Sequence, residues 1–196
     1  MYRIAVTNRK LCAGDFLTRI CEIAKGDTYD AVLLREKDLP EAEYEKLAEE
    51  VIRICGQSGK KLILHNYYET AIKLGHPYLH LPLSVWTEMP VDERRGLRDR
   101  MTQIGTSVHS EEQLEQAVAL GADYVSAGHI FVTDCKKGLA PRGLGFLQDI
   151  CLKSPVPVYA IGGIHAANEE QTTACGAAGV CVMSGCMTCQ NYFHVV

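Results

Sequence analysis

Residues 128–138 of this 196-residue chain, GHIFVTDCKKG, hold an imidazole, a hydroxyl, a carboxyl, a thiol and two ammonium groups. Imidazole takes up and releases protons near neutral pH, and ammonium groups bind anions. The segment follows an apolar run, residues 123–127, that is typical of a buried strand. Because α/β barrels build their active sites at the carboxyl ends of their strands, the sequence predicts an enzyme acting on a small phosphorylated molecule. His129 is the predicted acid and base.

The same segment offers further contacts for a substrate. Thr133 supplies a hydroxyl, and we expect Lys136 to hold a substrate phosphate or carboxylate while Lys137 points outward. Glycines at both ends of residues 138–143 are typical of hinges, so we expect this stretch to act as a lid. An ordinary surface loop is the alternative.

Two cations follow the second predicted strand. Arg35 and Lys37 lie two residues apart and share a face of extended chain, so both can reach one anionic group. The alternative is a solvated loop in which they pair with Glu36. Further polar residues at the ends of other predicted strands are candidates for substrate binding: His65, Asn66, His80, Ser107 and His109. For the three histidines, packing in the protein interior is the more common role.

Two glycine-containing pairs follow the last two predicted strands. At Gly162 and Gly163 backbone N–H groups can approach an anion closely, and a following helix would add its positive N-terminal end. Ser184 and Gly185 are expected to supply the other half of a barrel phosphate site. The alternative for the glycine pair is a plain tight turn.

The elements that must position these residues alternate between short apolar runs and helical segments. Eight strands are predicted, at residues 2–7, 31–35, 62–65, 78–81, 103–106, 124–127, 156–161 and 179–183. Helices are predicted at residues 41–56, 110–120, 144–152 and 166–174, with Ser110 and Gln113 forming a capping box. The pattern predicts a single-domain α/β fold over residues 1–196, a compact (β/α)₈ TIM barrel. A doubly wound open sheet is the alternative.

The segment after the eighth predicted strand is short. Residues 184–196 are too few for a loop and a full helix, so we expect the eighth helix to be short or absent. A partner subunit could cover the resulting gap, and we therefore expect a homodimer.

Composition limits the function classes. The net charge of −4 argues against a nucleic-acid surface, and no apolar run approaches the ~20 residues of a membrane helix. Arg9 and Lys10 follow a strand rather than precede an apolar core, so we expect no secretory signal and a cytoplasmic protein. The nine cysteines are expected to be mostly buried thiols. Cys186 and Cys189 form a lone C-x-x-C without the second pair that a structural zinc site needs.

Several motifs together resemble the thiamine phosphate synthase superfamily. They are REK at residues 35–37, GTSVHS at 105–110, ADYV at 122–125, the segment 128–138, and AIGGI at 160–164, in that order. The resemblance covers roughly residues 2–185 and implies the same barrel fold.

One branch of that superfamily, the synthase, joins a pyrimidine pyrophosphate to a thiazole phosphate and needs Mg²⁺. The resemblance places its Gln, Asn-Asp and further Asp where this chain has Leu33, Asn66-Tyr67 and residues 81–86. Cys135 stands where the synthase usually has a second Thr. Both metal carboxylates are missing, which predicts weak Mg²⁺ binding. Without that ion, the departure of pyrophosphate loses its main charge stabilisation.

The other branch, the TenI-like thiazole tautomerase, resembles this chain more closely, in the whole segment 128–138 and in Leu81-Pro82. That enzyme aromatises a carboxythiazole phosphate tautomer by moving a proton, without a metal or other cofactor. The resemblance implies that His129 is the acid and base and that Gly162, Gly163, Ser184 and Gly185 hold the phosphate. It further implies that the pocket is lined by Arg35, Lys37, Ser107, Thr133 and Lys136.

Three functions are therefore compared. The leading hypothesis is a metal-free thiazole tautomerase whose ligand is a small phosphorylated thiazole. The second is thiamine phosphate synthase, a Mg²⁺-dependent transferase. The third is a non-catalytic regulator that binds a phosphorylated ligand, suggested by the departures at Leu33 and Tyr67.

Overall fold

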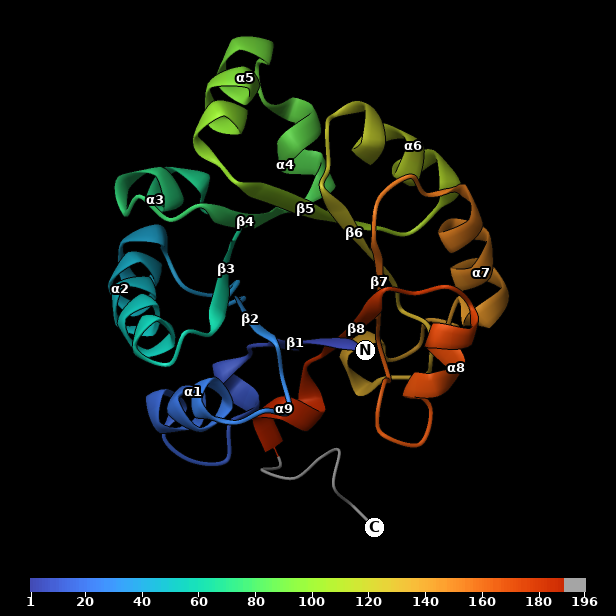
Figure 1. The fold of residues 1–196 in the computed structure, drawn as a ribbon, viewed down its shortest axis with the longest axis horizontal. Coiled ribbons are helices and arrows are strands. Elements are labelled where there is room, and N and C mark those ends of the chain that lie inside the picture. The colour runs from blue at the N-terminus through green and yellow to red at the C-terminus, as the bar shows by residue number, and fades with distance from the viewer. Residues whose placement is uncertain (189–196) are drawn as a thin grey trace.

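A computed structural model describes residues 1–188, in which eight parallel strands form a closed barrel in chain order (Figure 1). The strands are β1 (Tyr2–Val6), β2 (Ala31–Leu34), β3 (Lys61–His65), β4 (Tyr78–Leu81), β5 (Gln103–Val108), β6 (Tyr124–Gly128), β7 (Val158–Ile161) and β8 (Gly179–Val182). The barrel closes where β8 pairs with β1, with Tyr2 opposite Gly179. The predicted TIM barrel is confirmed, and the closed sheet excludes the doubly wound alternative.

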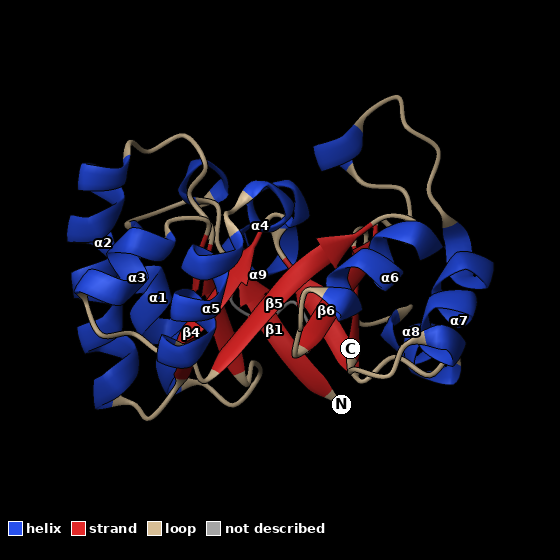
Figure 2. Ribbon diagram, turned by 90° about the horizontal axis from the view of Figure 1, so that it is seen from above, coloured by secondary structure: helices blue, strands red, loops and turns tan. Residues whose placement is uncertain are grey.

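Helices surround the barrel (Figures 1 and 2). They are α1 (Phe16–Lys25), α2 (Glu41–Gln57), α3 (Tyr68–Lys73), α4 (Leu83–Glu88), α5 (Val91–Arg100), α6 (Glu111–Ala119), α7 (Gly143–Lys153), α8 (Glu169–Ala174) and α9 (Ser184–Thr188), with short 3-10 turns η1 (Arg9–Leu11) and η2 (Asp134–Lys136). Figure 2 shows the strands from the side, with the loop between β6 and α7 rising above their carboxyl ends. No helix among residues 1–188 is long and apolar enough to cross a membrane.

Sequence patterns explain the longest helices. On α2 the face that meets the barrel carries Tyr44, Ala48 and Val51, all fully buried, because apolar residues recur at helical spacing. At the start of α6 the Ser110 hydroxyl accepts from the Gln113 N–H. The Gln113 side chain accepts from the N–H of His109 rather than of Ser110 itself, so the expected capping box is offset by one residue.

The ends of three elements differ from the sequence prediction. β7 begins at Val158, not residue 156, because Pro157 has no N–H to donate. α8 begins at Glu169 rather than residue 166, because the Asn168 side chain accepts from the His165 N–H and holds a turn there. After β8 the described residues add α9, Ser184–Thr188, and the rest of the segment in which a short or absent eighth helix was expected lies outside the described residues. Cys189 of the C-x-x-C lies outside the described residues.

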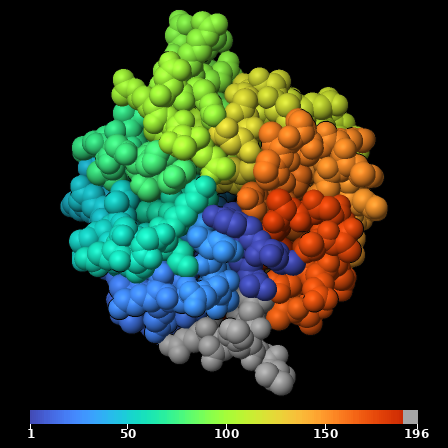
Figure 3. Space-filling view, in the orientation of Figure 1, coloured from blue at the N-terminus to red at the C-terminus, as the bar shows by residue number. Residues whose placement is uncertain are grey.

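Tyrosine side chains fill the amino-terminal half of the barrel interior. Tyr124 is buried, and its ring meets the edge of the Tyr159 ring at a centroid distance of 5.4 Å. Gly105 on the neighbouring strand makes room, since a Cβ there would lie 2.0 Å from the Tyr124 ring. Figure 3 shows this amino-terminal face, whose centre is occupied by the start of the chain in dark blue.

Candidate functional site

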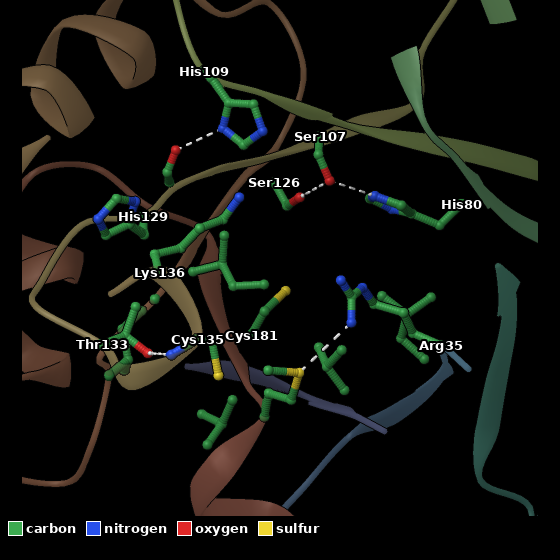
Figure 4. A pocket seen from close by; sticks show the side chains of 18 of the residues that line it. Arg35, His80, Ser107, His109, Ser126, His129, Thr133, Cys135, Lys136 and Cys181 are labelled. Carbon is green, nitrogen blue, oxygen red and sulfur yellow. Dashed lines mark hydrogen bonds between the residues drawn. The ribbon is translucent and has the colours of Figure 1, made fainter. Parts of the chain in front are cut away.

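A cavity of about 430 Å³ opens at the carboxyl ends of the strands (Figure 4). Every strand contributes a residue to its wall or is followed by a loop that does. The polar side chains in its lining are Arg35, Lys37, His65, His80, Ser84, Ser107, His109, Gln113, Ser126, His129, Thr133, Cys135, Lys136 and Ser184. Apolar walls come mainly from Val6, Leu33, Leu83, Ile161, Cys181 and Met183. The lining thus combines cations, imidazoles and hydroxyls around an apolar base.

The loop after β2 brings two cations into the cavity. Arg35 is largely buried, and its guanidinium lies 3.8 Å from the Met183 sulfur, with no carboxylate in an ion pair with it among the described residues. Burial lowers the pKa of Arg35, yet a guanidinium stays charged in proteins. Burial, and then the charges of Arg35 and Lys136, lowers the pKa of Lys37. These cations repel one another and are suited to sharing an anionic ligand.

Glu36, between the two cations, does not pair with either. Its buried carboxylate accepts from the Thr7 hydroxyl at 2.7 Å and from the Arg9 N–H at 3.1 Å, and it forms an ion pair with the Arg9 guanidinium. Thr7 in turn accepts from the Arg35 N–H at 2.9 Å. Glu36 therefore holds the loop after β2 in place through Thr7 and Arg9, on the side away from the cavity cations. The alternative of a solvated loop in which the cations pair with Glu36 is wrong.

His129 follows β6 and is partly buried at the edge of the cavity. Its Nε2 lies 3.4 Å from the Leu139 carbonyl, and this long hydrogen bond holds the ring only weakly. His109 contacts the preceding peptide, with its Nδ1 2.7 Å from the Gly128 carbonyl. Since a carbonyl only accepts, Nδ1 of His109 carries the hydrogen. His109 thereby helps to position the peptide that carries His129.

The loop after His129 lies over the cavity. Thr133 caps η2 by accepting from the Cys135 N–H, and Thr133, Cys135 and Lys136 all line the cavity. Lys137 points elsewhere and is exposed, 3.9 Å from Asp134. The predicted outward direction of Lys137 is therefore confirmed. Positive φ angles at Gly138 (81°) and Gly143 (80°) mark both ends of the expected lid.

Gly162 and Gly163 have a second role besides the predicted phosphate contact. Both have positive φ, and a Cβ on Gly162 would lie 2.4 Å from the His129 Cβ. The Gly162 carbonyl accepts from the Phe131 N–H at 3.0 Å. The glycine pair thus lets the segment that carries His129 pack directly against the end of β7.

The expected helix N-terminus next to Gly162 and Gly163 is absent, because α8 begins only at Glu169. Instead, α9 begins at Ser184, directly in the cavity wall, so its first backbone N–H groups have no partner within the helix. The Ser184 hydroxyl lies 3.8 Å from the Cys135 sulfur, which brings the lid loop against this end of α9.

A chain of neutral polar groups forms the wall that β4, β5 and β6 contribute. Nε2 of His80 lies 2.9 Å from the Ser107 hydroxyl, which lies 2.9 Å from the Ser126 hydroxyl. Nδ1 of His80 lies 3.0 Å from the Tyr124 hydroxyl. Burial, and then the nearby Arg35 and Lys37, lowers the pKa of His80 to about 3, so the ring is neutral at physiological pH. His65 stacks on it at 5.9 Å, and burial likewise lowers the pKa of His65.

The donor set does not suit Mg²⁺. No Asp or Glu lines the cavity, and no three His, Cys, Asp or Glu side chains in residues 1–188 gather so that they could hold a metal ion. Mg²⁺ in proteins depends on carboxylate oxygens. Tyr67, where the resemblance places one of the synthase's carboxylates, donates its hydroxyl to the Leu39 carbonyl at 2.6 Å and packs on Tyr44. In residues 81–86, where the resemblance places the synthase's further Asp, the cavity is lined by Pro82, Leu83 and Ser84.

Ten predicted site residues lie together in this cavity, and one does not. The ten are Arg35, Lys37, Ser107, His129, Thr133, Lys136, Gly162, Gly163, Ser184 and Gly185. Asn66 is outside the lining, where it adopts a left-handed φ of 72° and donates its N–H to the His80 carbonyl. Sequence reasoning missed Ser126 as a wall residue. Alternation along β6 was the available signal, since Ser126 is two residues before Gly128 and shares its face.

Comparison with known proteins agrees with the barrel fold and with the family that the sequence motifs resemble. A family model described as thiamine monophosphate synthase matches residues 3–186. The thiamine-phosphate synthase of Methanoculleus marisnigri is 33% identical over 180 residues, covering 91% of this chain and 84% of that protein. That of Fusobacterium nucleatum is 32% identical over 184 residues, covering 93% and 87%. The solved thiamine phosphate pyrophosphorylase of Pyrococcus furiosus has the same fold, with a TM-score of 0.82 at 24% identity over 98% of this chain and 89% of that one. The chain belongs to the thiamine monophosphate synthase family.

Proposed function

We propose that this protein is an enzyme of thiamine biosynthesis that moves a proton on a phosphorylated thiazole, a tautomerase that needs no metal ion. One observation carries the proposal: among residues 1–188, the lining of one cavity brings together an imidazole and three cations and holds no carboxylate. Such a lining can bind an anionic ligand and transfer its protons, and it lacks the ligands for Mg²⁺.

The proposed reaction needs one acid–base group. The imidazole of His129 uses a nitrogen lone pair to take a proton from one position of the substrate's thiazole ring. It then returns a proton to another position of that ring, so the substrate's composition is unchanged overall. Negative charge builds up on the ring while His129 holds the proton. Arg35, Lys37 and Lys136 can stabilise that charge, because all three lack carboxylate partners among the described residues. Ser184, Gly185 and the glycine pair would hold the phosphate.

Thiamine-phosphate synthase activity is the second candidate, and two observations favour it. The relatives named above carry that name, and a cluster of Arg35, Lys37 and Lys136 also suits a pyrophosphate. The missing carboxylates argue against it, because that reaction relies on Mg²⁺ to stabilise the leaving pyrophosphate.

One set of assays separates the candidates. The purified protein receives the carboxythiazole phosphate tautomer in EDTA, and separately pyrimidine pyrophosphate with thiazole phosphate and Mg²⁺. Turnover of the tautomer in EDTA that is lost in His129→Ala supports the tautomerase. Thiamine phosphate formed only with Mg²⁺ would establish the synthase instead. Ligand binding with neither reaction would show a binding protein and refute both enzymatic proposals.

A further inference from the structure

Asn168 lies in the loop between β7 and α8, and only 8% of it is exposed. Its side-chain nitrogen donates to the Gly163 carbonyl at 2.9 Å, and its side-chain oxygen accepts from the His165 N–H at 2.8 Å. The contact to His165 is sufficient to hold the turn before α8. The contact to Gly163 therefore has a further role.

The backbone carbonyls of residues 161–163 are all engaged by hydrogen bonds. Those of Ile161 and Gly162 accept from N–H groups of the segment after β6, each at 3.0 Å, and that of Gly163 accepts from Asn168. In a planar trans peptide the carbonyl and the following N–H point in opposite directions. The N–H groups of Gly162 and Gly163 therefore point away from the segment after β6, and neither has an acceptor among the described residues. Successive N–H groups on one side of a turn form a concave site for an anion, and both glycines line the cavity.

The peptide that follows Gly163 is held differently from the two before it. The carbonyls of Ile161 and Gly162 are bonded to backbone, whereas the Gly163 carbonyl is bonded to a side chain. Gly163 has a φ of 66°, and glycine lets the peptide that follows it rotate at little steric cost. Rotation by half a turn would bring the Gly163 carbonyl oxygen to the side of the two N–H groups. There it would repel the oxygens of a bound phosphate.

We propose that Asn168 is a positioning residue for phosphate binding: its side-chain amide holds the Gly163 carbonyl away from the anion that the glycine N–H groups bind. Asn168 acts through Gly163, since Asn168 itself does not line the cavity. The donor is well anchored, because the next residue, Glu169, forms an ion pair with Arg3 of β1 at 2.9 Å. The inference rests on the proposed function in one respect, namely that the ligand carries a phosphate.

Two substitutions separate the contacts of Asn168. Asn168→Asp keeps an oxygen that accepts from the His165 N–H but has no hydrogen to donate to the Gly163 carbonyl. Asn168→Ala removes both contacts and adds no charge.

Ser154→Ala is the matched control, at the opposite end of β7. The Ser154 hydroxyl also donates to a backbone carbonyl and accepts from a backbone N–H, both of Val156, and it lies outside the cavity lining. Calorimetry would measure the binding of thiazole phosphate, and of the thiazole alcohol that lacks the phosphoryl group, to the wild type and the three variants. Urea unfolding would give the stability of each.

In both Asn168 variants we expect thiazole phosphate to bind about 5- to 30-fold more weakly, as for the loss of a hydrogen bond to a charged group. The thiazole alcohol should bind within about twofold of the wild type, because it makes no use of the anion site. Ser154→Ala should lose stability but bind both compounds as the wild type does.

Three results would overturn the proposal. Unchanged binding of thiazole phosphate, or equal weakening of both compounds, would show that Asn168 supports only the fold. Weakening in Asn168→Asp but not in Asn168→Ala would assign the effect to the added charge. A wild-type protein that binds the alcohol as tightly as thiazole phosphate would show that no anion site exists.

NMR spectroscopy tests the backbone donors directly. On titration with inorganic phosphate, the amide protons of Gly162 and Gly163 should shift downfield in the wild type. In Asn168→Ala the same shifts should need at least about 5-fold more phosphate. Absence of a shift at both glycines in the wild type, or equal titrations in the two proteins, would contradict the proposal. If the binding results hold but the protein has no tautomerase activity, the proposed function fails and the role of Asn168 stands. Tautomer turnover with unchanged binding in both Asn168 variants would have the opposite meaning.

Discussion

His129 is held more loosely than any other histidine whose hydrogen bonds are described in the cavity. Its single contact to the Leu139 carbonyl is 3.4 Å long, while His80 and His109 have partners at 3.0 Å or less. A ring with a free nitrogen lone pair can accept a substrate proton, whereas a ring fixed on both sides cannot. His80 is fixed on both sides and is excluded by this criterion, whereas His109 is bonded through Nδ1 alone, at 2.7 Å, and is distinguished from His129 by that shorter contact.

Replacing His129 should therefore affect the chemical step. We expect His129→Gln to lower kcat for the tautomer about 10²- to 10⁴-fold, the usual contribution of a general acid–base group, with KM changed only a few-fold. His76→Gln is a matched control, because the His76 ring bonds to the Leu62 carbonyl and does not line the cavity. Steady-state kinetics of the two variants give the answer. A loss confined to KM would assign His129 to binding only.

Glu36 should act through the two cations beside it. In Glu36→Gln the amide nitrogen replaces one acceptor facing the Thr7 hydroxyl and the Arg9 N–H groups. We expect a free energy of unfolding lower by about 1–3 kcal/mol and a raised KM, because Arg35 and Lys37 lose their fixed position. Urea unfolding and kinetics measure the two effects. Unchanged KM with lowered stability would show that Glu36 supports the fold alone.

At the scale of elements, the end of β7 and the segment after β6 form one unit. Glycine at residue 162 has φ 104°, and His129 packs where a Cβ would be. A Gly-Gly pair in a sequence suggests either a turn or an anion site, and this third role depends on a contact between two strands that the sequence does not show. The phosphate role of the pair stays a prediction.

Gly162→Ala should therefore disturb both stability and the position of His129. The added methyl meets strain from the positive φ and overlap with His129, and we expect a loss of more than about 1 kcal/mol in the free energy of unfolding. Gly145→Ala on α7 is the control, since nothing lies within 4 Å of its Cβ position. That change should stabilise the protein by about 0.5–1 kcal/mol. Equal effects of the two substitutions in urea unfolding would contradict the packing argument.

The eight strands and ten of the residues that line the cavity could be predicted from the sequence, for physical reasons. Apolar runs rich in β-branched residues predict buried parallel strands, and residues that follow such runs must meet at one end of a barrel. The chain from Tyr124 through His80 to Ser107 and Ser126 could not be predicted. Its hydrogen bonds join residues 19 to 44 positions apart, and they depend on strand register. Helices such as α3 and α4 were also missed, because each spans only six residues.

For the whole molecule, the buried histidines make stability depend on pH. The pKa of His80 falls from 6.5 to about 3 on folding, so between these values the unfolded chain binds more protons than the native one. Keeping the His80 ring neutral in the native state therefore destabilises that state relative to the unfolded chain in acid. The free energy of unfolding decreases as pH falls from 6.5 toward 3, and His80 contributes up to about 1.4 kcal/mol per pH unit to this decrease. Tyr124, His65, Arg35 and Lys37 surround the ring, and none offers the negative charge that would favour protonation.

Urea unfolding of the wild type and of His80→Gln at pH 7, 6 and 5 tests this dependence. The variant should lose less stability than the wild type as pH falls, although its stability at pH 7 is lower. His65 should add a similar dependence in both proteins, since the pKa of His65 is also lowered. Identical slopes in the two proteins would show that His80 is not buried as a neutral ring.

The central claim is that this barrel transfers a proton without a metal. The most direct measurement is the rate of tautomer conversion by the purified protein in excess EDTA, compared with the rate in excess Mg²⁺. The cavity lining, rich in cations and without a carboxylate among the described residues, predicts turnover in EDTA, with the two rates equal within about twofold. Absence of conversion in EDTA, together with thiamine phosphate formation from the pyrimidine and thiazole substrates once Mg²⁺ is added, would contradict it.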